Sequence, residues 1–210
     1  MDTKTILAKK LLAIKAIRLS PEKPFTWASG WKSPFYCDNR KTLSYPSLRT
    51  FVKLELARIV AEQYPGATCI AGVATGAIAQ GALVAEELAL PFVYVRSKAK
   101  DHGMGNQIEG QLPENAQVVV VEDLISTGGS SLAAVAALRA AGCNILGMVA
   151  SYTYGFDVAR KAFEDAQVTL TTLTDYHAVV AAAVEEGYIR ESDLDLLHRW
   201  RSNPSEWTGK

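Results

Sequence analysis

The chain has 210 residues, of which 49% are hydrophobic and 21% charged, and its 22 basic residues balance 22 acidic ones. This is ordinary globular usage in a chain long enough to bury its own core, which argues against disorder, collagen and coiled coil. The zero net charge argues against binding a nucleic-acid backbone as the main activity.

The cysteines and the apolar stretches indicate the compartment. Cys37, Cys69 and Cys143 are widely spaced without a CxxC pattern, which indicates neither a disulfide framework nor a cysteine zinc site. The most apolar window, residues 132–150, is interrupted by Arg139 and Gly142, so we expect no membrane span. We therefore expect a cytoplasmic protein that has neither nucleic acid nor a membrane as a partner.

The N-terminal part predicts a helix followed by irregular structure. An apolar stripe over residues 6–17, interrupted by lysines, is typical of an amphipathic helix and not of a signal peptide. Residues 21–45 are dense in Pro, Trp, Gly and aromatic residues without a helical period, which predicts loops with short extended pieces. A second helix is expected over residues 47–64.

From residue 68 onward, short β-rich runs alternate with helical segments. This alternation predicts an α/β fold, in which helices cover both faces of a parallel sheet. Four consecutive valines, residues 118–121, suit a central strand buried on both sides. Residues 190–200 are interpreted as a solvated helix surface or a subunit contact. The predicted strands cover residues 68–73, 92–96, 118–121, 144–152 and 168–173, and the predicted helices residues 77–88, 131–141, 156–165 and 176–187.

The most informative motif follows the valine run. Glu122 and Asp123 come first, and Ser-Thr-Gly-Gly-Ser-Ser over residues 126–131 then opens an alanine-rich helix. Unpaired amides and the positive end of the helix dipole favour an anion there. The pattern predicts a monophosphate cradle beside two acids suited to sugar hydroxyls or to a Mg²⁺-bound sugar. The alternative is an ordinary strand–turn–helix with Ser130 as N-cap. No P-loop sequence is present.

Three other segments suggest binding chemistry. Residues 96–105 combine cations with glycines and predict a flap that offers positive charge, although a solvated loop has the same composition. Residues 71–79 join a strand end to a helix start through small residues, which suits either a second anion or tight packing. The aromatic residues within 25–38 suit either stacking on a flat ring or core packing.

Together these motifs resemble a known family. Residues 118–131 resemble the signature for phosphoribosyl pyrophosphate (PRPP) of the type I phosphoribosyltransferases. Arg96 with the Ala-Lys-x-His-Gly pattern after it, and the S-G-x-K-S-P-x-Y pattern of residues 29–36, resemble the catalytic loop and the N-terminal hood of the orotate phosphoribosyltransferases. The resemblance implies the type I phosphoribosyltransferase fold, a mostly parallel central sheet flanked by helices with a small hood. It implies one domain over residues 1–210, with the hood at about residues 1–45 and the α/β core at about residues 66–175.

The resemblance also implies an activity. Such an enzyme transfers the phosphoribosyl group of PRPP to orotate and releases pyrophosphate, which forms orotidine 5′-monophosphate in de novo pyrimidine biosynthesis. It implies Mg²⁺ bound mainly through PRPP, and a homodimer whose flap reaches the neighbouring site. A transferase for another base would lack the flap and hood patterns. A PRPP-sensing regulator that binds nucleic acid would show a basic face, against which the zero net charge argues.

The family's site residues carry over to matching positions. Arg96, Lys100 and His102 would be catalytic and would contact the pyrophosphate of PRPP. The PRPP-binding set adds Glu122, Asp123, Leu124, Ile125, Ser126, Thr127, Gly128, Gly129 and Ser130, the pyrophosphate loop is Ala74, Thr75, Gly76 and Ala77, and the orotate-binding set is Ser126, Tyr36 and Lys32.

The chain departs from the family pattern at four places. Gly76 and Ala28 stand where some members carry lysine, and Ser97 follows Arg96 where a lysine is common. Residues 151–156 lack an arginine that some members use for the orotate carboxylate. Other groups must therefore supply part of the positive charge that the substrates need.

Overall fold

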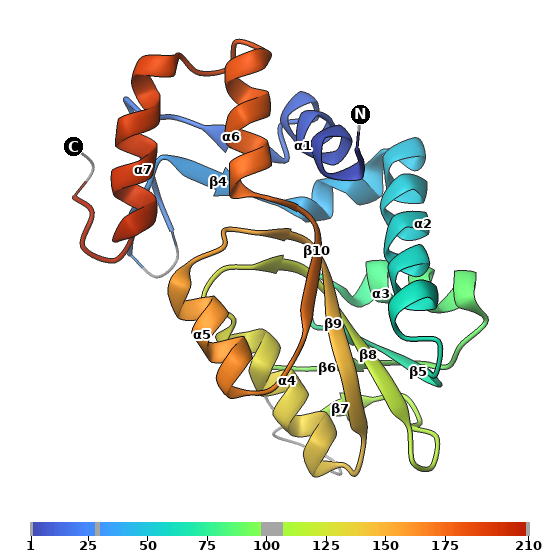
Figure 1. Ribbon diagram of the computed structural model, residues 1–210. Coiled ribbons are helices and arrows are strands. Elements are labelled where there is room, and N and C mark those ends of the chain that lie inside the picture. Colours follow the sequence, from blue (N-terminus) through green and yellow to red (C-terminus); the bar gives the residue numbers. More distant parts are fainter. Residues whose placement is uncertain (1, 28–29, 98–106, 209–210) are drawn as a thin grey trace.

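The computed structural model of the protein describes residues 2–27, 30–97 and 107–208, and its centre is one six-stranded sheet (Figure 1). The strand order is β10-β9-β8-β5-β6-β7, and only β7 runs antiparallel to its neighbour. The predicted α/β architecture is thus confirmed. The strands are β5 Cys69–Val73, β6 Phe92–Val95, β7 Ile108–Glu109, β8 Gln117–Ile125, β9 Asn144–Thr153 and β10 Leu170–Asp175.

Helices cover both faces of this sheet, with α1, α2 and α3 on one side and α4 and α5 on the other (Figure 1). The valine run explains why both faces need cover. Val119 and Val121 pack with residues of α1, α2 and α3, whereas Val118 and Val120 pack with residues of α4 and α5. All four are fully buried. These helices are α1 Thr3–Ala13, α2 Pro46–Gln63, α3 Ile78–Leu88, α4 Gly129–Ala140 and α5 Asp157–Asp165.

Local signals set where several helices begin. The Asp2 carboxylate accepts a hydrogen bond from the Thr5 amide at 2.8 Å and caps α1. Pro46 opens α2, where its missing N–H costs nothing. Asp175 ends β10 and caps α6 (Tyr176–Glu185) by accepting from the Ala178 amide at 3.0 Å. Among the helices in the described ranges, none has the length and apolar composition needed to cross a bilayer.

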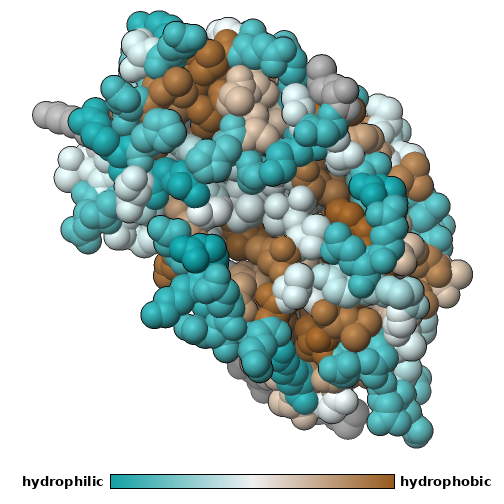
Figure 2. Space-filling model, viewed as in Figure 1, coloured by the Kyte–Doolittle hydropathy of each residue, from teal (hydrophilic) through white to brown (hydrophobic). Residues whose placement is uncertain are grey.

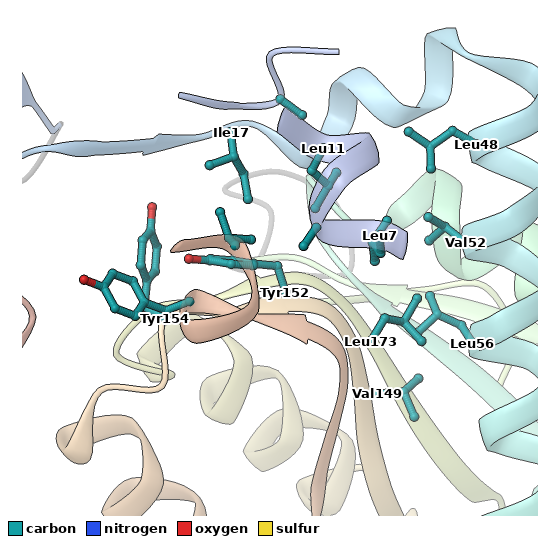
Figure 3. Packing of buried hydrophobic residues seen from close by; sticks show 14 of the residues in the cluster. Leu7, Leu11, Ile17, Leu48, Val52, Leu56, Val149, Tyr152, Tyr154 and Leu173 are labelled. Carbon is teal, nitrogen blue, oxygen red and sulfur yellow. The ribbon is translucent and has the colours of Figure 1, made fainter. Parts of the chain in front are cut away.

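The apolar side of α1 and α2 builds the larger part of the core (Figure 3). Leu7 and Leu11 of α1 and Leu56 of α2 are fully buried and belong to the same cluster as Val149 of β9 and Leu173 of β10. The N-terminal helix is therefore part of the sheet's packing and fixes where the segment after it begins.

That following segment forms a small hood of short hairpins, which confirms the predicted loops with extended pieces. β1 (Ile17–Leu19) pairs antiparallel with β4 (Phe35–Cys37), and β2 (Phe25–Thr26) pairs with β3 (Lys32–Ser33). A 3₁₀ helix, η1 (Asn39–Ser44), then leads into α2.

Residues 190–200 are only in part the solvated helix surface that the sequence indicates, because Asp195, His198 and Arg199 are exposed whereas one face of the helix is buried. They form η2 (Glu191–Asp193) and most of α7 (Leu194–Ser202), and Leu197 and Trp200 have no exposed surface. The Trp200 ring stacks on Phe35 of the hood, with 5.8 Å between centroids and 8° between planes. The charged residues of α7 suggest solvation, but the spacing of Leu197 and Trp200 places both on one apolar face.

Trp200 joins the C-terminal helix to the hood, so its removal should destabilise the protein strongly. We expect Trp200→Ala to lower the free energy of unfolding by about 3–5 kcal/mol, because it opens a large cavity. Urea denaturation followed by circular dichroism measures this loss. Tyr188→Ala, at a side chain that is 51% exposed, should stay within about 0.5 kcal/mol. A similar small loss for Trp200→Ala would contradict the role given to α7.

Candidate active site

Two adjacent acids lie inside β8 and not after it as the sequence predicted. The strand continues past the valines to Ile125 because β9 stays paired beside it, with Glu122 opposite Ala150 and Ile125 opposite Thr153. The acids are thereby held by a regular backbone at the carboxyl end of a central strand, where ligands of such sheets bind.

Glu122 is almost fully buried, with 4% of its surface exposed. Its Oε2 accepts a hydrogen bond from the Ser131 hydroxyl at 2.9 Å, and its Oε1 accepts from the Asp123 amide at 2.9 Å. Burial, and then the neighbouring Asp123 carboxylate, raise the pKa of Glu122 to about 9. Burial also raises the pKa of Asp123. The pair therefore keeps a proton at neutral pH and can both donate and accept hydrogen bonds, which suits a sugar diol.

The turn after β8 leaves the start of α4 open. Gly128 adopts φ +84°, and a side chain at this position would also meet the Phe163 ring at 2.9 Å. The N-cap is Gly128, without a side-chain cap, so the alternative interpretation of Ser130 as N-cap is wrong. Ser131 bonds to Glu122 and not to the helix backbone. The first amides of α4 are thus available to an anion.

The loop over residues 74–77 lies against the acids. It leads from β5 into α3, whose N-cap, Ala77, makes no side-chain cap bond. At Gly76, a Cβ atom would collide with the carboxylate of Asp123. Glycine is therefore the residue that lets this loop approach the carboxylate.

Two adjoining cavities connect these groups. The first, which we call the acidic cavity, has a volume of about 400 Å³ and the second, the aromatic cavity, about 250 Å³. Both are lined by Cys37 and Leu124, so they lie side by side. The acidic cavity is further lined by Asp38, Arg40, Val73, Ala74, Thr75, Gly76, Glu122, Asp123 and Ser130, and the aromatic cavity by Thr26, Trp27, Tyr36, Ser126 and Tyr154.

The structure brings nine of the eighteen predicted site residues into the lining of these cavities: Tyr36, Ala74, Thr75, Gly76, Glu122, Asp123, Leu124, Ser126 and Ser130. Ala77, Thr127, Gly128 and Gly129 line neither cavity, although each lies in the loop or turn next to the acids. Lys32 donates to the Thr26 hydroxyl at 2.8 Å, beside the aromatic cavity and outside its lining. Ile125 is fully buried, and its backbone oxygen accepts a hydrogen bond from the Tyr154 amide at 3.0 Å, so it presents no surface to a ligand in this structure. Arg96 lines neither cavity, and its Nη1 lies 3.4 Å from Oε1 of Glu109. Lys100 and His102 lie outside the described residues.

Sequence reasoning missed Asp38 and Arg40. Both come directly after the hood motif, and nothing in their neighbourhood in the sequence relates them to the acids of β8. A long-range contact brings this segment to the acids: Nδ2 of Asn39, which lies between the two residues, donates to the backbone oxygen of Asp123 at 2.7 Å. A cluster of polar residues after an aromatic hood is the one signal that marks this segment in the sequence.

A cavity larger than either of these lies elsewhere in the described part of the chain. It has a volume of about 640 Å³ and lies between α5 and β10, where Figure 2 shows hydrophobic surface in a hollow. Its lining includes Phe156, Phe163 and Leu170 and none of the predicted site residues. The convergence of motifs, and not cavity size, identifies the candidate site.

The raised pKa of Glu122 predicts a pH-dependent stability. An acid whose pKa rises from 4.5 to about 9 on folding binds its proton more tightly in the folded protein, so stability falls as pH rises between these values. Glu122→Gln removes this titration and keeps an acceptor for Ser131. Between pH 6 and 9, we expect wild type to lose about 3–4 kcal/mol more stability than this variant, because the proton contributes about 1.4 kcal/mol per pH unit below the pKa of the folded state.

Urea unfolding at several pH values between 6 and 9 measures both slopes. Glu62→Gln, which removes an exposed carboxylate from α2, is the matched control and should keep the wild-type slope. Parallel slopes for wild type and Glu122→Gln would contradict the assignment of the buried proton.

Comparisons with known proteins agree with this geometry. The family model for the phosphoribosyl transferase domain matches residues 55–186. Orotate phosphoribosyltransferase of Phocaeicola vulgatus is 65% identical over 96% of this chain and 95% of its own, and that of Bacillus caldolyticus is 52% identical over 96% and 97%. The crystal structure of orotate phosphoribosyltransferase from Aeropyrum pernix matches with a TM-score of 0.75 at 27% identity, over 88% of this chain and 99% of that one. The chain therefore belongs to the orotate phosphoribosyltransferase family, as its motifs predict.

Proposed function

We propose that this protein transfers the phosphoribosyl group of PRPP to orotate, which yields orotidine 5′-monophosphate and pyrophosphate in pyrimidine biosynthesis. The observation that carries the proposal is the pair of adjoining cavities, one polar and one aromatic, with Cys37 and Leu124 in the lining of both. Two substrates placed in these cavities would meet at their shared boundary, where a bond between them can form.

PRPP would occupy the acidic cavity and the turn beside it. The open amides of α4 and the hydroxyls of Thr127 and Ser130 suit the 5-phosphate, because they offer several donors around one anion. Glu122 and Asp123 would hold the ribose hydroxyls. The loop over residues 74–77 would lie along the pyrophosphate.

Orotate would occupy the aromatic cavity. Trp27, Tyr36 and Tyr154 offer flat faces and edges for the pyrimidine ring, and the Ser126 hydroxyl offers a directional hydrogen bond. Among the described residues that line this cavity, none is basic. Lys32, held 2.8 Å from Thr26, is the cation we assign to the orotate carboxylate.

The reaction exchanges one bond for another at the anomeric carbon. Orotate N1, ionised in the site, forms a bond to C1′ while the bond from C1′ to the pyrophosphate oxygen breaks, and the electron pair leaves with pyrophosphate. The protein then needs no covalent nucleophile. Its contribution is to align the reactants and to stabilise the negative charge on the leaving group. We assign to Arg96, Lys100 and His102 the role of stabilising the negative charge on the leaving pyrophosphate.

Mg²⁺ fits this site as a companion of PRPP. Within the described ranges, no group of three or more His, Cys, Asp or Glu side chains could hold a metal ion. Mg²⁺ commonly binds through one or two carboxylates together with substrate phosphates, and Glu122 or Asp123 could supply such a carboxylate. When bound, the ion would neutralise charge on the pyrophosphate.

We also propose that the enzyme is a cytoplasmic homodimer whose flap completes the neighbouring subunit's site. The resemblance of residues 96–103 to the family's catalytic loop supports the shared flap. The unpaired Cys37, Cys69 and Cys143 support a reducing compartment.

Orotate turnover tests the function directly. With PRPP and Mg²⁺ present, we expect the orotate absorbance to fall with time and pyrophosphate to appear in equal amount. Omitting PRPP, or replacing orotate with adenine or hypoxanthine, should abolish the signal. Turnover of a purine base with none of orotate would refute the proposal.

Loss of the flap lysine should damage turnover more than binding. We expect Lys100→Ala to lower kcat about a hundredfold, or about 3 kcal/mol, because a donor to the leaving group is lost. Steady-state kinetics at saturating PRPP measure this. Lys10→Ala, an exposed position on α1, is the matched control and should keep full activity.

Mixing Lys100→Ala with Asp123→Asn tests the sharing of sites. If the flap acts across the dimer, each mixed dimer has one intact site, so an equimolar mixture should recover about a quarter of wild-type activity. A mixture as inactive as its components would count against the shared flap.

A further inference from the structure

The acidic cavity has an unusual balance of charge. Three carboxyl groups, those of Asp38, Glu122 and Asp123, line it, and the last two share one retained proton. The single basic side chain among its described lining residues is that of Arg40. A cavity meant for a pyrophosphate needs positive charge near the leaving group. Among the described residues that line the cavity, Arg40 is therefore the one that can supply this positive charge.

The loop over residues 74–77 cannot supply this charge itself. It contains no basic residue, and the Asp123 carboxylate takes the place that a side chain at position 76 would need. A lysine there would displace either the loop or the acid. A cation that compensates for this position must therefore reach the cavity from another element.

Arg40 does so from the 3₁₀ helix η1. Its Nε donates to Oδ1 of Asp38 at 2.7 Å, and its side chain is 60% exposed. Within the described ranges, no hydrogen bond engages the two terminal amino groups of its guanidinium. Held by Nε alone, the guanidinium keeps its forked pair of donors for a ligand, and this fork matches phosphate oxygens.

The segment that carries Arg40 is held by hydrogen bonds to β8, the strand that carries Glu122 and Asp123. Asn39, which is 4% exposed, donates from Nδ2 to the backbone oxygen of Asp123 at 2.7 Å. The Thr42 hydroxyl donates to the backbone oxygen of Asn39 at 2.7 Å. These bonds hold the start of η1 at a set position relative to the acids. A binding residue on such a supported element needs little reorganisation when its ligand arrives.

We propose that Arg40 binds the pyrophosphate group of PRPP in place of the lysine that the loop lacks, and that Asp38 is the positioning residue that orients it. This inference rests on the proposed function. Asp38 holds the guanidinium at Nε, and both residues line the acidic cavity. Arg40 would thereby stabilise the leaving group from the hood side.

Binding measurements with two fragments of PRPP test the assignment. Inorganic pyrophosphate with Mg²⁺ probes the proposed contact, and ribose 5-phosphate probes the rest of the site. For Arg40→Gln we expect pyrophosphate affinity, measured by calorimetry, to fall about tenfold to a hundredfold, because charge-assisted contacts are lost. The affinity for ribose 5-phosphate should change less than about twofold, because that ligand lacks the group in question.

Four other variants define the result. Arg58→Gln removes an exposed arginine paired with Glu55 and Glu62 on α2 and should leave both affinities unchanged. Arg40→Lys should recover part of the pyrophosphate affinity, because it keeps the charge without the fork. Asp38→Asn retains an acceptor for Nε and should weaken pyrophosphate binding less than Asp38→Ala.

The outcomes separate this inference from the proposed function. Unchanged pyrophosphate affinity in Arg40→Gln would overturn the inference, and so would equal losses for both fragments. If wild type turns over orotate while Arg40→Gln keeps its KM for PRPP, only the inference fails. If wild type does not turn over orotate, the proposed function fails, and the fragment affinities still decide whether Arg40 contacts pyrophosphate.

Discussion

The cost of burying two neighbouring carboxylates governs the design of this site. Glu122 and Asp123 lie at the end of a strand that helices enclose on both faces, where an unpaired charge is expensive. The fold offsets this cost through a retained proton, the Ser131 hydroxyl, and the charge of Arg40 near Asp123. The elements that surround the acids are therefore held to specific positions, and the same restraint prepares the site for a polar ligand.

The hood is held to the core by aromatic packing and not by hydrogen bonds alone. Phe35 and Trp27 of the hood contact Tyr154 and Trp200, which come from the end of β9 and from α7. The aromatic cavity is built from the edge of this packing, because Trp27 and Tyr154 serve in both. Core packing, one of the two alternatives that the sequence leaves open, is therefore confirmed for these rings, whereas stacking on a flat ligand stays a prediction.

The sequence predicts those parts of the protein whose structure depends on interactions between residues that are close together in the chain. The valine run and the turn after it are contiguous, so both the central strand and the anion cradle can be predicted from the sequence. The end of β8 could not be, because pairing with β9 carries the strand past Val121 into polar residues. The approach of Arg40 to the acids depends on an Asn39 contact across 84 positions. Likewise, the burial of Trp200 depends on rings far away in the chain, and the two-residue strand β7 is too short to show a period.

The boundary between the two cavities has a chemical consequence. Burial, and then the carboxylates of Asp123 and Asp38, hold the pKa of the Cys37 thiol well above its ordinary value. The sulfur therefore stays protonated and weakly nucleophilic where sugar and base would meet. An electrophilic anomeric carbon could then pass beside this thiol without capture as a thioglycoside, because burial and the nearby carboxylates keep the adjoining wall inert.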